Sequence, residues 1–182
     1  MRTIALVLAW IIASLAHAAN PEPPMGADEA RVLLGRAAFG ATEAELRSFA
    51  ALPRTQAVER LLSDARTQAQ TPPPEWADRF VRPPRKQMSE AERKAFQREQ
   101  IEKGVALRAW WYREMLTTPS PLAEKMTLFW HNHFTSSQQK VKSPVLLYRQ
   151  NVLLRRHALG NFSELLRAIA KDPAMLVYLD NV

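Results

Sequence analysis

The stretch from Glu124 to Phe134 concentrates side chains that could do chemistry. It places Glu124, His131, Asn132 and His133 among large apolar residues. A carboxylate and an imidazole can bind a divalent metal or exchange protons with a substrate. At 100° per residue, Glu124 and His131 share one face of a helix, whereas His133 lies on the opposite face. A regular helix therefore allows Glu124 and His131 to meet one ligand, but not both histidines.

Two interpretations of this pair remain open. In the first, Glu124 and His131 form an acid/base pair or part of a metal site. In the second, His131 is a hydrogen-bonded core residue and Glu124 pairs with a buried arginine. Zinc sites need three or four converging ligands, and no third is in place here. The cofactor is therefore unknown, with a divalent metal as one option. The letters His-Asn-His do not indicate an HNH nuclease, because in those enzymes the three residues come from separate elements.

The predicted helix 145–159 carries cations among apolar residues that occupy nearly every direction. On a helical wheel, Arg156 lies in the narrow sector that the apolar residues leave open. Arg155 lies beside Tyr148 on a second side of the helix, and His157 lies on a third side. Buried charges are costly unless they are paired, so structural ion pairing is favoured over catalysis. The carboxylates expected as partners are Glu124, Glu164, Asp172 and Asp180.

The segment 172–181 ends with a carboxylate beside an amide, Asp180 and Asn181. Asp172 precedes a proline and is expected to cap a short helix. A carboxylate next to an amide can present a ligand or act as a general base. The catalytic candidates are therefore Glu124, His131 and Asp180, and the binding candidates are His133, Asn132, Arg156, His157 and Asn181.

The elements that position these residues are all predicted to be helices. Two capping boxes, Thr42 with Glu45 and Ser89 with Glu92, mark helix starts. No stretch shows the alternation of a strand. The chain is therefore expected to be all-α, an irregular multi-helix bundle of about seven to eight helices. The expected helices are 29–39 (capped by Asp28), 42–51, 53–65, 91–117, one that contains the opening stretch, 145–159, 161–170 and 172–179.

The longest predicted helix, 91–117, has apolar residues on two sides, so its C-terminal half is expected to be buried on both. One stripe comprises Ile101, Val105, Ala109, Tyr112, Met115 and Leu116, and the other comprises Phe96, Leu107 and Trp110. The preceding segment 67–87 is rich in proline and charge, and is expected to form an exposed connection or a lid.

The N-terminus has the pattern of an export signal. A short basic start precedes an apolar run at 4–15, and Ala16-His17-Ala18 fits a cleavage site. The run is shorter than the roughly 20 residues that span a bilayer. We therefore expect a signal peptide at 1–18, a proline-rich leader at 19–27 and one helical domain at 28–182. The mature protein would lie in the periplasm or outside the cell, without a stable membrane anchor.

The chain has a net charge of +7 and no cysteine. A cysteine-free protein in an oxidising compartment depends on core packing instead of disulfides. The basic excess suits anionic envelope material, although it also serves simple solubility. The run Arg155-Arg156-His157 is too short and too embedded for a nucleic-acid patch, so no nucleic-acid partner is expected.

Several blocks, taken in order, carry a family resemblance. They are Leu33 to Gly40, Glu124-Lys125 with Phe129 to Phe134, Gln150-Asn151 with Arg155 and Ala158 to Phe162, and Asp172 to Leu176 with Tyr178 to Asn181. Together they closely resemble the exported bacterial family catalogued as domain of unknown function 1800, over essentially the whole mature chain. That family has no settled activity, so the resemblance indicates no reaction and leaves open whether the protein is an enzyme.

The resemblance implies a largely helical exported protein that is usually longer than this one. Its pattern continues beyond the Leu-Asp-Asn block, so the chain resembles an N-terminal portion that stops early at Val182. A truncation, a frameshift or a real short form would each explain that ending. The family's genes often neighbour those of an exported sulfatase-like family, which implies a partner of that kind.

We expect an envelope or extracellular module that binds or processes anionic or polymeric material. One alternative is a metal-assisted or acid/base hydrolase whose site is completed by a missing C-terminal segment. Another is a structural or partner-binding scaffold with no catalysis. Substrate, reaction, metal content and oligomeric state are not determined by the sequence.

Overall fold

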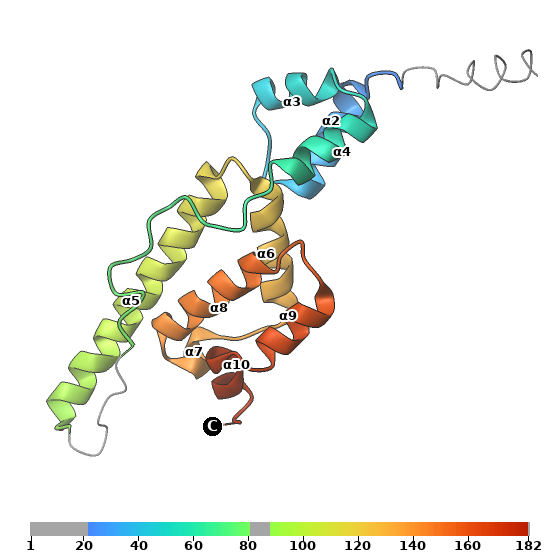
Figure 1. Ribbon diagram of the computed structural model, residues 1–182. Coiled ribbons are helices and arrows are strands. Elements are labelled where there is room, and N and C mark those ends of the chain that lie inside the picture. The colour runs from blue at the N-terminus through green and yellow to red at the C-terminus, as the bar shows by residue number, and fades with distance from the viewer. Residues whose placement is uncertain (1–21, 81–87, 182) are drawn as a thin grey trace, which may run out of the picture.

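The computed structural model describes residues 22–80 and 88–181, which are 67% helical with nine helices and no strands (Figure 1). The predicted all-α class is confirmed. The helices are α2 (Gly26–Ala37), α3 (Glu43–Ala50), α4 (Arg54–Ser63), α5 (Glu90–Thr117), α6 (Pro121–His133), α7 (Gln138–Val141), α8 (Pro144–Arg156), α9 (Phe162–Ile169) and α10 (Pro173–Tyr178). The short α7 was not predicted. The expected signal peptide at 1–18 lies outside the described residues. Among the described residues, no helix has the length and apolar character needed to cross a membrane.

Helices α2, α3 and α4 pack together at one end of the molecule (Figure 1). Their apolar faces meet around Leu34, Phe49 and Leu61, all buried. Leu122, in the first turn of α6, packs against the same cluster and joins it to the remaining helices. The capping box that begins α3 is confirmed, because Thr42 Oγ1 accepts from Glu45 N and Glu45 Oε2 accepts from Thr42 N.

Helix α2 begins earlier than expected, so the prediction that Asp28 caps it was wrong. Met25 is the N-cap residue and provides no side-chain cap. The backbone N–H of Met25 donates to Leu52 O at 2.9 Å, which holds the start of α2 against the connection between α3 and α4. Asp28 lies in the first turn, where a carboxylate favours the helix dipole, and pairs with Arg31 at 3.1 Å.

Most residues of the connection before α5 are exposed in its described part, but residues 70 and 71 are anchored to the helix. Glu114 of α5 is fully buried and accepts from the backbone N–H groups of Gln70 and Thr71, at 3.0 and 2.7 Å. The indole of Trp110, one turn earlier, donates to Thr71 O at 3.1 Å. These bonds satisfy backbone groups that would otherwise be buried without partners, and they hold residues 70 and 71 against α5, along which the connection runs (Figure 1).

The expectation that the C-terminal half of α5 is buried on both sides was wrong. Trp110 and Glu114 are buried, but Tyr112 is 63% and Leu116 is 81% exposed on the other face. A helical wheel identifies apolar stripes, yet only the packing of the other elements decides which stripe is covered. Here α8 and the connection cover one side of α5, and the other side forms an open apolar face.

Helix α8 is the centre of the second group, which includes α6, α7, α9 and α10 (Figure 1). Leu154 of α8 is fully buried against Leu165 of α9 and Met175 of α10. Next to this apolar core, the Gln150 amide accepts from Ser136 Oγ and donates to Asp172 Oδ2 at 2.8 Å. Asp172 also accepts from Met175 N, so the predicted cap of α10 is confirmed.

The buried carboxylate of Glu114 generates a stability prediction. Glu114→Ala should lower the free energy of unfolding by about 2 to 4 kcal/mol, because two backbone N–H groups lose their acceptor. Glu114→Gln, which keeps one acceptor oxygen, should lose less. Glu102→Ala, on an exposed part of the same helix, is the control. Urea unfolding measures all three, and equal stabilities of the Glu114→Ala and Glu102→Ala variants would contradict the assignment.

Candidate functional site

A buried ion pair joins α6 to α8 at the stretch that the sequence singled out. The side chains of Glu124 and Arg155 are only 2% and 1% exposed. Arg155 Nε donates to Glu124 Oε1, and Arg155 Nη2 donates to Glu124 Oε2 at 3.0 Å. The indole N–H of Trp111 donates to Glu124 Oε2 at 2.9 Å. Both oxygens of Glu124 are therefore occupied, as expected for the structural interpretation of this residue.

Arg155 also contacts α5. Its guanidinium lies 5.4 Å from the ring centroid of Trp110, in the range of a cation–π contact. Burial acts to raise the pKa of Glu114, but hydrogen bonds from Thr71 and Gln70 and the charge of Arg155 together lower it below its usual value. Arg155 thus pairs with Glu124, whereas Glu114 is held mainly by hydrogen bonds from Thr71 and Gln70 and only to a minor extent by the charge of Arg155.

His131 contacts the same indole that binds Glu124. Its ring centroid lies 5.1 Å from that of Trp111. Burial lowers the pKa of His131 below its usual value, although a backbone hydrogen bond opposes this shift. A neutral imidazole can donate at one nitrogen and accept at the other. The structure therefore brings Glu124 and His131 to one indole, but the hydrogen bonds of Glu124 go to Arg155 and Trp111.

An apolar pocket of about 720 Å³ opens beside His131, between α5, α6 and α8. Two of its polar lining residues are His131 and Asn151. Asn151 is buried, and neither its Nδ2 nor its Oδ1 has a hydrogen-bond partner among the described residues. Most of the remaining lining is apolar and includes Phe39, Leu107, Trp111, Tyr112, Met115, Leu116, Leu128 and Leu147.

The other predicted site residues do not join this cluster. Asp180 is exposed and pairs with Lys140 at 2.6 Å, beside α7. Asn181 is exposed at the end of the described chain. Asn132, His133 and Arg156 are also exposed, and His157 is half-buried at the C-terminus of α8. His133 stacks on Phe129, with ring centroids 6.3 Å apart, instead of entering the pocket.

The described residues do not bring together a metal site. Within 22–80 and 88–181, no three His, Asp or Glu side chains form a group that could hold a metal ion. His131 and Glu124, the pair considered for that role, have no third ligand of these types beside them. A divalent metal in this part of the chain would therefore depend on other ligands.

Sequence reasoning missed the roles of Glu114, Gln150 and Asn151. Glu114 lies one turn after Trp110 on a mostly apolar side of α5, and this spacing was the only signal that it is buried. Gln150 and Asn151 are neighbours on α8, and only the residues that pack against each amide show that their roles differ. Gln150 is fully satisfied, whereas the amide of Asn151 is unpaired within the described structure.

The ion pair predicts strong coupling between two helices. Arg155→Leu should lower the free energy of unfolding by about 3 to 5 kcal/mol, because it leaves Glu124 buried without its counter-ion. Adding Glu124→Leu should restore part of that loss. Arg156→Leu, at the exposed neighbouring position, should have little effect. Chemical denaturation of Arg155→Leu, Glu124→Leu, the double variant and Arg156→Leu tests this, and additive losses in the double variant would contradict the coupling.

The neutral state of His131 predicts a pH dependence. Its pKa in the folded protein lies below the value of about 6.5 expected in the unfolded chain. The unfolded state therefore binds more protons, and stability should fall as the pH drops from about 7 to 5. His131→Leu should flatten this slope, whereas the exposed-site variant His133→Leu should keep it. Equal slopes in thermal unfolding of the wild type and His131→Leu would contradict the prediction.

Comparison with known proteins agrees with the family resemblance. A family model described as "Protein of unknown function (DUF1800)" matches residues 32–182. No curated protein and no solved structure matches the chain. The matched range contains the Glu124–Arg155 pair, His131 and Asn151, and it covers well over half of the 182 residues. The chain therefore belongs to the DUF1800 family of proteins of unknown function.

Proposed function

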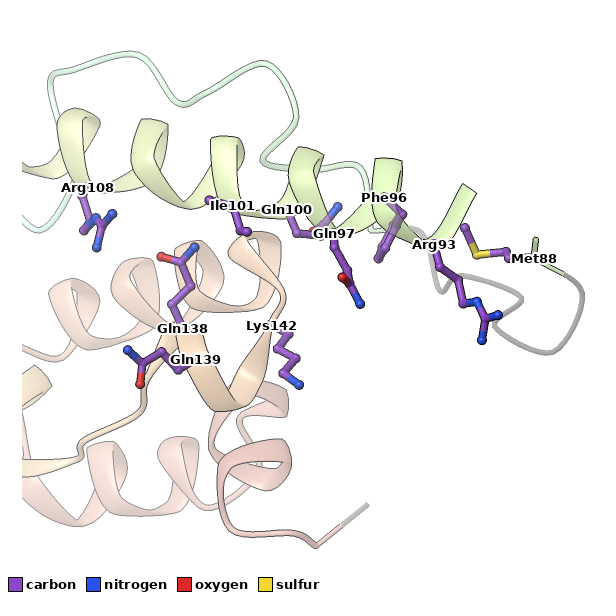
Figure 2. Close-up of a pocket in the computed structure, with 10 residues that line it drawn as sticks. All are labelled: Met88, Arg93, Phe96, Gln97, Gln100, Ile101, Arg108, Gln138, Gln139 and Lys142. Carbon is purple, nitrogen blue, oxygen red and sulfur yellow. The ribbon is translucent and has the colours of Figure 1, made fainter. Parts of the chain in front are cut away.

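We propose that this protein is an exported module of the bacterial envelope that binds an acidic, hydroxyl-bearing polymer such as an acidic polysaccharide. The observation that carries the proposal is a groove of about 670 Å³ between α5 and α7 (Figure 2). Three cations, Arg93, Arg108 and Lys142, line it together with four glutamines, and none of the described residues that line it is a carboxylate. Export itself rests on the signal pattern at 1–18.

The groove takes its side chains from two elements that face each other. Arg93 and Gln97 extend from α5 toward the side of α7, and Gln138 of α7 points back toward α5 (Figure 2). Arg108 lies near Gln138 at one end, and Arg93 lies at the other end beside Met88 (Figure 2). A chain-like ligand lying along α5 would therefore meet cations at both ends of the groove.

The residue types match a polymer that carries both acids and hydroxyls. Arginine and lysine bind carboxylate or phosphate groups through charge-assisted hydrogen bonds. Each glutamine amide offers donors and acceptors that suit hydroxyl groups. Phe96 and Ile101 add apolar surface that can pack against the face of a sugar ring. Arg93, Arg108 and Lys142 form no ion pair with the described residues, so their charges are free for a ligand.

Lys142 supports a ligand-binding role for α7. It ends this short helix with φ at 55°, in the left-handed region that favours glycine. A side chain there costs roughly 1 to 2 kcal/mol, and such costs are often kept where the side chain has a function. The charge of Lys142, placed in the groove at this backbone cost, is consistent with anion binding.

The described residues give less support to the two alternative functions, a hydrolase and a scaffold without ligands. An acid/base hydrolase based on Glu124 and Asp180 would need free carboxylates, but Glu124 binds Arg155 and Asp180 binds Lys140. A scaffold without ligands would leave the groove cations unexplained. A sulfatase-like exported partner is proposed on the family resemblance alone, and it is compatible with polymer binding.

Replacing the groove cations tests the proposed function. The triple variant Arg93→Gln/Arg108→Gln/Lys142→Gln should bind polygalacturonate about tenfold or more weakly than the wild type, because three ion contacts are lost. Wild-type affinity should also fall as salt is raised from 50 to roughly 300 mM, since these charges are solvent-accessible. Isothermal titration calorimetry measures both effects.

A matched control separates groove binding from general charge attraction. The variant Arg98→Gln/Arg113→Gln/Arg167→Gln changes the net charge equally at exposed positions outside the groove. It should bind polygalacturonate about as well as the wild type. Equal weakening by the two triple variants, or no saturable binding by the wild type, would refute the proposal.

A further inference from the structure

We infer that the apolar pocket beside the groove binds the N-acyl group of an acylated amino sugar, with the ligand's amide at Asn151. The inference rests on the proposed function and names the polymer more closely, as one with N-acylated units. It depends on Asn151 and on the apolar walls, although one groove cation, Arg108, also lines the pocket. Three features support it: the position of the pocket, the nature of its walls and the unpaired amide of Asn151.

The pocket and the groove are neighbours. Arg108 and Gln138 line both cavities. Gln138 packs directly on Gly104 of α5, where an added Cβ would lie 1.5 Å from Gln138 Nε2. The absence of a side chain at Gly104 thus allows α7 to approach α5 closely and sets Gln138 between the two cavities. A sugar in the groove could therefore extend a substituent past Gln138 into the pocket.

The walls of the pocket fit an acyl chain better than a polar or charged group. Most lining side chains are aliphatic or aromatic, with Trp111 and Tyr112 on α5 and Leu128 on α6. No carboxylate lines the pocket. Its volume of about 720 Å³ lies in the range of small-molecule sites, which are mostly apolar with a few placed polar groups. Tyr112 and Leu116 are exposed, so a hydrocarbon chain in the pocket would cover their apolar surface and lose part of its own contact with water.

Asn151 determines which kind of acyl linkage fits. This residue is 3% exposed and lines the pocket, and both polar atoms of its amide lack partners in the described chain. A buried amide without hydrogen bonds is unfavourable, so a ligand that supplies them gains affinity. Asn151 offers one donor group and one acceptor. The amide group of a ligand offers a carbonyl acceptor for Asn151 Nδ2 and an N–H donor for Asn151 Oδ1. An ester group offers an acceptor but no donor.

A pair of uncharged ligands tests the inference without involving the groove cations. The probes are methyl 2-(hexanoylamino)-2-deoxyglucoside and the corresponding methyl 2-O-hexanoylglucoside, which differ in one N–H group. The amide should bind the wild-type protein about tenfold or more tightly than the ester, since only the amide has an N–H in its acyl linkage to donate to Asn151 Oδ1. Isothermal titration calorimetry measures the two affinities.

Substitution of Asn151 provides a second test of the inference with the same two probes. Asn151→Leu should bind the two probes equally, and its melting temperature should rise because an unpaired buried amide is removed. Asn132→Leu, at an exposed position on α6, is the control and should keep the amide preference. The melting temperature also verifies that the Asn151 variant folds.

Two results would overturn the inference. One is equal binding of amide and ester by the wild type, or binding of neither. The other is an amide preference that survives in Asn151→Leu. Either result would leave the groove proposal standing if polygalacturonate binding still depended on Arg93, Arg108 and Lys142. Conversely, loss of that dependence would refute the proposed function even if the amide preference were observed.

Discussion

The packing of the helices depends most on the buried ion pair between Arg155 and Glu124. The side chain of Arg155 is buried with Glu124 of α6, which it binds, and its guanidinium lies 5.4 Å from the ring centroid of Trp110 of α5. Buried carboxylates without a cation would be strongly destabilising. Arg155 thus connects α8 to α6 through Glu124 and to α5 through Trp110, and Glu114 separately fixes residues 70 and 71 along α5. The indole of Trp111, held by Glu124, then forms a wall of the apolar pocket.

The proposed binding surfaces lie where this interior meets α5. Polar groups that hold the helices together, such as Gln150, have their hydrogen bonds satisfied within the protein. The amide of Asn151, the next residue, has no hydrogen-bond partner in the described chain. The cations Arg108 and Lys142 have no carboxylate partner there either. Unsatisfied polar groups beside a cavity are natural candidates for ligand contacts. This contrast separates the residues that we assign to stability from those that we assign to binding.

Short-range patterns allowed much of the fold to be predicted, and long-range contacts explain the rest. The capping boxes at Thr42 and Ser89 act within one turn, so sequence alone located α3 and α5. The sequence also indicated that Glu124 could pair with a buried arginine, but three cations on α8 were candidates, and only packing selects Arg155. The open face of α5 and the unpaired amide of Asn151 were unpredictable, because each depends on which neighbours other helices provide.

Hydrogen–deuterium exchange with polygalacturonate tests the central claim most directly, because it locates the bound polymer. Binding in the groove should slow exchange in α7 and in the α5 segment from residue 93 to 108, which together line it. Helix α9, which contributes no lining residue, should be unchanged. Protection confined to α9 and α10, or no protection at saturating polymer, would contradict the account.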